Sequence, residues 1–417
     1  MNLTTELVDA CRRQFPALSR RVGDHPAMFF DGPGGTQTPL RVIEAVSHYL
    51  AHTNANHEGR FATSRESDAL LHEAHRAMAD FLGADDAEEI AFGANMTSLT
   101  FALSRSLAQT WREGDEVVVT RLDHDANVSP WVLAARDAGA TVRYVEVNRD
   151  DCTLDLEDFR GKINDRTVLV AVGCASNASG SINPVKQICR WAREAGALSF
   201  LDAVHFAPHA RIDVQDFGCD LLACSAYKFF GPHVGVMWGR RSLLEATPAY
   251  KVRPATDALP GKWMTGTQNH EGIAGALSAV EYLAALGRDI QADESLDRRT
   301  ALTAAMTGIC GYEGGLIERL LDGLAGIEAI KVWGITDKAR LGERLPTVSI
   351  THERHTADEL AEQLGRRGMF VWSGNYYALQ LTETLGLEPQ GMCRIGLVHY
   401  NTAQEVDALL AVLGELS

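Results

Sequence analysis

Lys228 is the side chain whose surroundings most favour covalent chemistry. It follows the apolar run at residues 221–224 and precedes Phe229 and Phe230, whereas the neighbours of the other six lysines suit a solvated surface. Burial of an ammonium group costs several kcal/mol unless the charge is paired or neutralised, so the pattern predicts a lowered pKa for this lysine. The neutral amine is a nucleophile of the kind that forms Schiff bases. The alternative is a lysine whose charged end reaches solvent from a strand edge.

Asp202 supplies the acidic group that such a lysine needs if its partner is pyridoxal 5'-phosphate (PLP). Residues 197–201 are predicted to form a buried strand that ends in Asp202, with His205 in the loop behind it. A carboxylate beside the pyridinium nitrogen of PLP keeps the ring protonated, and the protonated ring absorbs electrons from a substrate carbanion. An acid at one strand end and a lysine after the next strand therefore predict a PLP site.

The two segments together resemble a known cofactor signature. Asp202-x-x-His205 followed by Ser225-x-x-Lys228 is similar to the signature of fold-type I PLP enzymes, and most of all to that of the class V aminotransferase group that contains the cysteine desulfurases. The resemblance spans residues 28–400. It makes Lys228 and Asp202 catalytic, and it implies cofactor contacts from Asp202, His205, Ser225, Tyr227 and Lys228.

His124 opens a second matching segment. Residues 124–131 follow a predicted strand at residues 116–120 and resemble the His-Ala-Asn-x-x-Pro-Trp segment of the desulfurases. In that family the histidine lies flat on the PLP ring and exchanges protons with the substrate, two tasks that suit a planar group that titrates near neutrality. The resemblance therefore makes His124 both a catalytic and a cofactor-binding residue. A loop histidine bonded to its neighbours is the alternative.

The start of a predicted helix at residues 93–100 is a candidate phosphate site. A helix start that follows a strand offers free N–H groups and the positive end of the helix dipole. Simple N-capping by Asn95 or Thr97 is the alternative. The resemblance implies that Thr97 and the backbone of Met96 bind the PLP phosphate.

Two more segments are similar to cofactor contacts of the family. Ser-Asn-x-x-Gly at residues 176–180 implies that Asn177 bonds the phenolic oxygen of PLP. Residues 266–269 resemble a Gly-Thr-Pro-Asn loop in which Thr267 reaches the phosphate of the neighbouring subunit, although Gln268 departs from that pattern. Because the family builds each site from two subunits, the resemblance implies a homodimer with shared active sites.

Arg394 is the expected anchor for a small amino-acid substrate. Residues 392–396 match the family segment whose arginine grips the substrate α-carboxylate, which a planar guanidinium binds through two hydrogen bonds. A surface arginine in an ion pair is the alternative. Asn56, in the polar stretch at residues 54–60, is similar to part of the family's Asn-x-His-Arg loop, which makes it a substrate contact. A solvated loop is the alternative there.

Tyr377 marks a departure from the desulfurases. Those enzymes carry a catalytic cysteine, which takes up sulfur as a persulfide, in a loop that corresponds to residues 369–378. By spacing, Tyr377 stands at the position of that cysteine, and no cysteine lies between Cys310 and Cys393. A phenol forms no persulfide, so Tyr377 is predicted to contact the substrate as a pocket wall or proton donor. The aromatic residues of this loop suggest a substrate side chain less polar or larger than that of cysteine.

The predicted elements explain how these residues meet. Strands and helices alternate between residues 142 and 173, a rhythm that implies an α/β fold with a mostly parallel central sheet wrapped by helices. Ligands bind at the carboxyl ends of such strands, so the loops with His124, Asn177 and Asp202 are expected to converge. This is the fold-type I PLP-dependent transferase architecture that the resemblance implies.

Length and pattern predict more than one domain. A chain of 417 residues exceeds a single compact core by the usual prior of ~150 residues per domain. Residues 273–325 are predicted to be mostly helical, with turn breaks near Gly287 and Gly311. We predict an N-terminal segment that packs on the small domain, a large PLP-binding domain and a smaller C-terminal α/β domain, at residues 1–28, 29–285 and 286–417.

The composition excludes several classes of partner and site. The formal net charge of −16 argues against nucleic acid and anionic membranes as partners. No run approaches the ~20 apolar residues of a membrane helix, and the N-terminus shows no signal-peptide pattern. The eight cysteines are scattered without a CxxC pair, so neither a metal site nor a disulfide framework is expected, and the pattern favours a cytoplasmic protein.

Together these features predict a PLP-dependent enzyme that acts on a small amino acid. The favoured reaction is β-elimination or desulfurisation at Cβ without a protein persulfide. Transamination and Cα epimerisation are alternatives, because they share every step up to the carbanion. A PLP-fold protein without turnover is the contrasting class.

Overall fold

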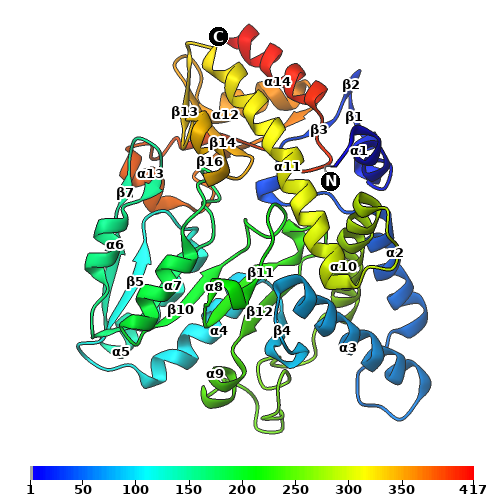
Figure 1. Ribbon diagram of the computed structural model, residues 1–417, viewed down its shortest axis with the longest axis vertical. Coiled ribbons are helices and arrows are strands. Elements are labelled where there is room, and N and C mark those ends of the chain that lie inside the picture. The colour runs from blue at the N-terminus through cyan, green and yellow to red at the C-terminus, as the bar shows by residue number, and fades with distance from the viewer. Residues whose placement is uncertain (1–2) are drawn as a thin grey trace.

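The computed structural model describes residues 3–417 as an α/β protein built around a seven-stranded sheet (Figure 1). The order of the sheet is β4-β12-β11-β10-β9-β5-β6. In that order its strands are Ile90–Gly93, Gly235–Gly239, Leu221–Ser225, Leu198–Asp202, Thr167–Gly173, Glu116–Thr120 and Thr141–Val145. Strand β12 pairs antiparallel with both neighbours and all other pairs are parallel, so the predicted mostly parallel sheet is confirmed.

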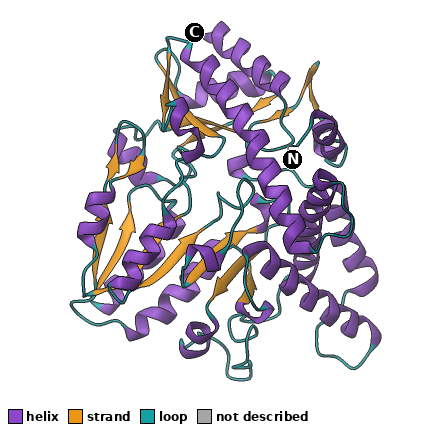
Figure 2. Cartoon of the chain, viewed as in Figure 1, coloured by secondary structure: helices purple, strands orange, loops and turns teal. Residues whose placement is uncertain are grey.

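Helices cover both faces of this sheet (Figure 2). Side chains of a strand alternate between faces, so in β10 Phe200 belongs to one apolar cluster and Leu201 to the other. The cluster around Phe200 includes side chains of α4 (Met96–Leu107) and α5 (Ser129–Ala138). The cluster around Leu201 includes side chains of α3 (Ala62–Leu82), α7 (Val185–Glu194) and α10 (His270–Gln291).

The C-terminal part forms a smaller α/β unit around an antiparallel sheet with the order β13-β14-β17-β16. In that order its strands are Ile330–Trp333, Thr347–His352, Met392–Gly396 and Trp372–Gly374. Its helices are α12 (Ala357–Arg366), α13 (Leu379–Leu385) and α14 (Ala403–Leu416). The short α13 directly follows the loop that carries Tyr377, and the sequence patterns did not predict it.

The N-terminal segment contacts this smaller unit. Strand β3 (Met28–Phe29) pairs parallel with β15 (Met369–Phe370). Arg12, at the end of α1 (Thr5–Arg12), donates to Glu405 in α14 at 2.8 Å between Nη2 and Oε1. The predicted division at residues 1–28, 29–285 and 286–417 stays a prediction, and residues 1 and 2 lie outside the described part of the chain.

Two long helices, α10 and α11 (Arg298–Ala325), pack against each other, and α11 runs on to α14 of the smaller unit (Figure 1). The turn breaks predicted near Gly287 and Gly311 are wrong, because both glycines lie inside continuous helices. A Cβ on Gly287 would come within 2.6 Å of the carbonyl carbon of Ala301. Gly287 therefore serves close helix packing and does not end a helix. The predicted boundary between residues 285 and 286 also falls inside α10.

Shorter elements complete the chain. The remaining α-helices are α2 (Leu40–His48), α6 (Leu156–Lys162), α8 (Val214–Phe217) and α9 (Arg241–Ala246). Two ribbons are formed by β1 (Arg21–Val22) with β2 (His25–Pro26) and by β7 (Val147–Asn148) with β8 (Thr153–Leu154). Between residues 3 and 417, no helix has the length and apolar character needed to cross a membrane.

Candidate active site

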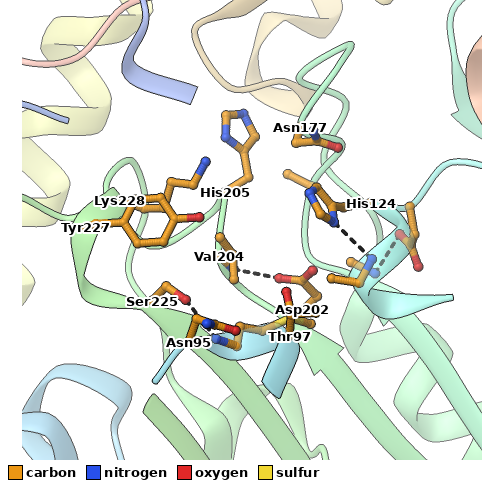
Figure 3. Close-up of a pocket in the computed structure, with 15 residues that line it drawn as sticks. Asn95, Thr97, His124, Asn177, Asp202, Val204, His205, Ser225, Tyr227 and Lys228 are labelled. Atoms are coloured by element: carbon orange, nitrogen blue, oxygen red, sulfur yellow. Dashed lines mark hydrogen bonds between the residues drawn. The ribbon is translucent and has the colours of Figure 1, made fainter. Parts of the chain in front are cut away.

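A pocket of about 550 Å³, here called the inner pocket, opens at the carboxyl ends of β5, β9, β10 and β11 (Figure 3). His124 follows β5, Asn177 follows β9 and Asp202 ends β10, and all three line the pocket. The expected convergence of these loops is confirmed. The pocket is also lined by the predicted cofactor contacts Met96, Thr97, His205, Ser225, Tyr227 and Lys228.

Lys228 lies in a one-turn helix after β11, and 9% of its surface is exposed. Its Nζ donates a hydrogen bond to the carbonyl oxygen of Pro33, which lies in a glycine-rich loop at residues 31–36. Burial, together with the nearby charge of Arg394, lowers the pKa of Lys228 to about 7, and Asp202 opposes this shift. The predicted lowering of the pKa is confirmed, and the lysine does not reach solvent.

Lys262 corrects the expectation that the other six lysines are solvated. Its side chain is 7% exposed, and its Nζ donates to the carbonyl oxygens of Leu244 and Glu245 at 2.9 and 2.7 Å. These carbonyls belong to the last turn of α9, where a cation is favourable. Lys262 is a buried helix cap. Burial alone therefore does not single out Lys228, whereas its place in the pocket does.

Two buried carboxyl groups lie in the floor of the inner pocket. Oδ1 of Asp202 accepts a hydrogen bond from the backbone N–H of Val204 at 2.8 Å, and burial raises the pKa of Asp202 to about 6. Asp123 was missed by the sequence patterns. It accepts from the N–H of Gly173 at 2.9 Å and from Nδ2 of Asn127 at 3.0 Å, and burial raises its pKa. An acid in the loop after β5, directly before His124, was the available signal.

His124 is held in one tautomer. Its Nδ1 accepts a hydrogen bond from the N–H of Ala126 at 3.0 Å, so a neutral ring carries its proton on Nε2. Burial and the charges of Lys228 and Arg394 lower the pKa of His124 to about 4, so the imidazole is neutral at pH 7. The ring of Tyr377 stacks on this imidazole, with 5.3 Å between the centroids and 26° between the planes.

The start of α4 borders the inner pocket. The side chain of Asn95 accepts from the N–H of Ser98 at 2.8 Å, so the N-cap considered as the alternative is present. The N–H of Met96 donates to Oγ of Ser225 at 3.1 Å. Thr97, which lies between these two bonded positions, is exposed and lines the pocket. This is the geometry expected of an anion site at a helix N-terminus.

Two side chains present polar atoms that lack a partner among the described residues. Asn177 donates from Nδ2 to the carbonyl of Tyr376 at 2.9 Å, and its Oδ1 is buried without a hydrogen bond. His205 bonds Oγ1 of Thr347 through Nε2 at 3.0 Å, and its Nδ1 is likewise unpaired. Each unpaired buried group costs about 1–3 kcal/mol. Both residues line the inner pocket, so these atoms suit a polar ligand there.

A second cavity, here called the outer cavity, adjoins the inner pocket and has an empty volume of about 1000 Å³. The two share His124, Asn177, Tyr227 and Lys228 in their walls. Arg394 lines the outer cavity, is 4% exposed, and donates from Nη1 to the carbonyl of Asn177 at 2.8 Å. Its Nε has no partner among residues 3–417. Arg394 is therefore no surface ion pair, and it keeps donors for a carboxylate.

Two predicted site residues lie away from both cavities. Asn56 is exposed, and its Oδ1 accepts from the N–H of His57 at 3.0 Å. Thr267 is exposed and lines neither cavity. The substrate contact of Asn56 and the reach of Thr267 to a neighbouring subunit stay predictions. Within the part of the chain that the structure describes, no group of three or more histidine, cysteine or acidic side chains could hold a metal ion.

The arrangement of lysine, acid and histidine at these strand ends agrees with a comparison of whole sequences. The model of the family described as "Aminotransferase class-V" matches residues 28–409. This chain belongs to the aminotransferase class-V family. Class V aminotransferases and cysteine desulfurases are PLP-dependent, and this member is accordingly a PLP-dependent enzyme.

Relatives of this class-V member carry the name cysteine desulfurase. A cysteine desulfurase of Enterobacter sp. strain 638 is 30% identical, and one of Pectobacterium carotovorum subsp. carotovorum strain PC1 is 29% identical, with 97% of both chains covered in each case. Among solved structures, the apo cysteine desulfurase of Thermococcus onnurineus NA1 has a TM-score of 0.87 at 26% identity, and the match covers 98% of this chain and 97% of that one. The fold-type I prediction is thus confirmed.

Proposed function

We propose that this enzyme catalyses β-elimination or desulfurisation at Cβ of a small amino acid, without a persulfide on the protein. The observation that carries the proposal is the stacking of Tyr377 on His124. By sequence spacing, Tyr377 stands where the desulfurases are expected to carry their cysteine. Seven of the eight cysteines are buried. The exposed one, Cys310, lies on α11 and lines neither the inner pocket nor the outer cavity.

The inner pocket fits PLP. The unpaired atoms of Asn177 and His205 suit polar atoms of the cofactor, and the start of α4 at Thr97 and Met96 suits its phosphate. Lys228 has the neutral amine that covalent attachment requires, because its pKa is lowered to about 7. The ring would be bounded by Asp202, His124, Ser225 and Tyr227. When bound, PLP supplies a protonated ring that takes up the electron pair left at Cα of the substrate.

The side chains around the two cavities divide the remaining tasks. Arg394 binds the substrate carboxylate, and its pKa, lowered by burial to about 10, keeps it charged at pH 7. Lys228 or His124 moves the proton of Cα, because both lie in the wall shared by the two cavities, His124 is neutral at pH 7 and about half of Lys228 is neutral there. The phenol of Tyr377 protonates the group that leaves Cβ. Elimination from cysteine consumes water and yields pyruvate, ammonia and sulfide.

Three alternatives remain from the sequence. Transamination and epimerisation need the same removal of the Cα proton, so the geometry of Lys228 and His124 serves them equally. A protein without turnover is the contrasting class. A homodimer with shared active sites agrees with the exposed positions of Asn56 and Thr267, which would then serve the partner's site.

The test is a product screen with the PLP-loaded enzyme. Amino acids and S-substituted cysteines are scored for pyruvate, sulfide or thiol, and keto acid, and the enantiomeric composition of the remaining substrate is measured. We expect pyruvate with sulfide or thiol. A keto acid that keeps the intact side chain would indicate transamination. A D-amino acid would indicate epimerisation. No change in any substrate would indicate a protein without turnover. After incubation with cysteine, mass analysis of the alkylated protein should show no sulfur adduct, and a stoichiometric adduct required for turnover would restore the persulfide mechanism.

A further inference from the structure

The outer cavity has aromatic walls beside its single carboxylate anchor. Trp372 and Tyr377 line it and are 52% and 71% exposed, although both are large and partly apolar. The ring of Tyr376 lies under the guanidinium of Arg394, at 4.1 Å from its carbon to the ring centroid. A free cysteine thiol would fill a small part of a cavity of about 1000 Å³. Besides Trp372 and Tyr377, the rings of Tyr227 and Tyr376 belong to the lining of the remaining space.

Strand register places Trp372 next to the anchor. In the smaller sheet β16 pairs antiparallel with β17, and Trp372 is directly opposite Arg394. Directly opposed residues project from the same face of a sheet with neighbouring side chains. On the other side the indole lies against Gly34, where a Cβ would overlap the ring. The glycine-rich loop therefore lets the indole stay beside the point where the substrate carboxylate binds.

The loop that carries the tyrosines is tied to the inner pocket. Tyr377 accepts from the N–H of Asp125 through its carbonyl at 2.7 Å, and its own N–H donates to Oδ1 of Asn375 at 3.1 Å. Tyr376 and Tyr377 both have left-handed backbones, with φ of 55° and 62°. Non-glycine residues keep such conformations only where surrounding contacts hold them. The backbone that carries these rings is thus held in place, which is what a selective side-chain subsite requires.

The charges of the outer cavity select against a charged side chain. Its lining includes Lys228 and Arg394 and no aspartate or glutamate. Arg394 is taken by the α-carboxylate and Lys228 by the chemistry, so no anion is present for a basic side chain and no further cation for an acidic one. An uncharged apolar or aromatic group is the chemistry that fits the remaining walls.

We propose that the outer cavity, defined by Trp372, Tyr376 and Tyr377, binds an apolar or aromatic substituent on the substrate, so that the preferred substrates are S-substituted cysteines with a bulky uncharged group. This rests on the proposed function and names its substrate class. The Cβ–S bond breaks with its electron pair left on sulfur, and the sulfur takes a proton to give a thiol. The Cα proton is lost to a base, and water releases pyruvate and ammonia, with no oxidant or reductant consumed.

The first experiment compares L-cysteine, S-methyl-L-cysteine and S-benzyl-L-cysteine with the PLP-loaded enzyme. Burial of a phenyl group favours the benzyl derivative, and we expect its kcat/KM for pyruvate release to exceed that of L-cysteine by about 10- to 100-fold. Trp372→Ala should bring the ratio of the two kcat/KM values to within about threefold of one. Leu133→Ala, which truncates a side chain of α5 that is 37% exposed and lines neither cavity, should leave the ratio unchanged.

The second experiment measures binding without elimination. L-Phenylalanine and L-alanine carry no leaving group and differ only in the phenyl group, so the ratio of their dissociation constants reports the side-chain subsite. We expect phenylalanine to bind at least about tenfold tighter by calorimetry, and Trp372→Ala to remove that difference. Equal binding of the two, with equal kcat/KM for cysteine and S-benzylcysteine, would overturn the subsite while the proposed function stands. Tighter phenylalanine binding without pyruvate from any cysteine derivative would support the subsite and defeat the proposed function.

Discussion

The floor of the inner pocket and the aromatic loop at residues 372–378 differ in the kind of control they exert. The floor holds ionisable groups at strand ends, and the pKa values of Asp202, His124 and Lys228 are all shifted, with burial as the largest cause in each. The aromatic loop presents Trp372 and Tyr377 as half- to mostly exposed rings. Desolvated charge controls proton movement and exposed rings control shape, so under our proposal the ionisable groups of the inner pocket set the reaction and the aromatic loop sets the substrate.

The two regions are nevertheless joined by hydrogen bonds. Asn177, in the wall of the inner pocket, donates to the carbonyl of Tyr376, and the N–H of Asp125 donates to the carbonyl of Tyr377. Both bonds use backbone oxygens of the loop, so its side chains are free to vary while its path stays constant. Substitutions in the floor should therefore abolish turnover, and substitutions in the loop should change rates and selectivity by smaller factors.

The largest effect is expected for Lys228→Ala. Loss of the amine removes both the covalent attachment and a base, so turnover should fall by about 10³-fold or more, and the visible absorbance of bound cofactor should change. Lys262→Met is the matched control, since Lys262 is equally buried but caps α9. Wild-type absorbance that borohydride removes from purified Lys228→Ala would contradict the assignment.

The second largest loss of turnover is expected for Asp202→Ala. Without a carboxylate the cofactor ring loses its proton and becomes a poor electron sink, so we expect turnover to drop by about 10²–10³-fold while some PLP stays bound. Cofactor content and initial rates measure the two quantities separately. Near-normal rates in a folded Asp202→Ala enzyme would show that the acid has another role.

Arg394→Ala tests the junction between the two regions. The guanidinium supplies charge-assisted hydrogen bonds, so its loss should raise the half-saturation concentration by about 10- to 100-fold, with a smaller change in kcat. Arg394→Lys keeps the charge but loses the planar guanidinium, so its half-saturation concentration should lie between those of the wild type and Arg394→Ala. An unchanged half-saturation concentration would place the carboxylate elsewhere.

Tyr377→Phe should slow elimination by about tenfold, below the usual 10²–10⁴ of a general acid because the ring is mostly exposed. Cofactor absorbance should stay as in the wild type, since the stacked ring is retained. The effect should shrink for substrates whose leaving group is a more acidic thiol. If Tyr377→Phe and the wild type had equal rates on substrates with poor leaving groups, Tyr377 would act only as a wall of the pocket and not as a proton donor.

The smallest effect is expected for the gain of sulfur transfer in Tyr377→Cys. The new thiol would sit on a backbone that is bonded to Asn375 and Asp125. We expect no stoichiometric persulfide on this variant after incubation with cysteine. Mass analysis of the alkylated protein, with Cys310→Ser as background to remove the exposed thiol, gives the readout. A persulfide that forms and is consumed during turnover would show that the single change at residue 377 is enough to restore the sulfur transfer of the desulfurases.

The residue types near the strand ends were sufficient to predict most of the inner pocket, although Asp123 in its floor was missed. Lys228 lies between apolar segments, and its lowered pKa follows from burial whatever the details of packing. His124, Asp202 and Asn177 each stand at the end of a predicted strand, and parallel strands bring such ends together. Alternation of strand and helix is a local property, so the sequence by itself was enough to predict the class of fold and the meeting of these side chains in one pocket.

Contacts between distant segments required the tertiary structure. The pairing of Trp372 with Arg394 depends on the register of β16 and β17, which no local pattern specifies. Gly287 ends no helix because its missing side chain accommodates Ala301 of α11, and Lys262 is buried because α9 presents its last carbonyls to it. Asp123 belongs to the pocket floor through hydrogen bonds from Gly173 and Asn127, and Gly173 lies far from it along the chain. Chemistry was thus encoded in residue types along the chain, whereas selectivity depends on which surfaces folding places face to face.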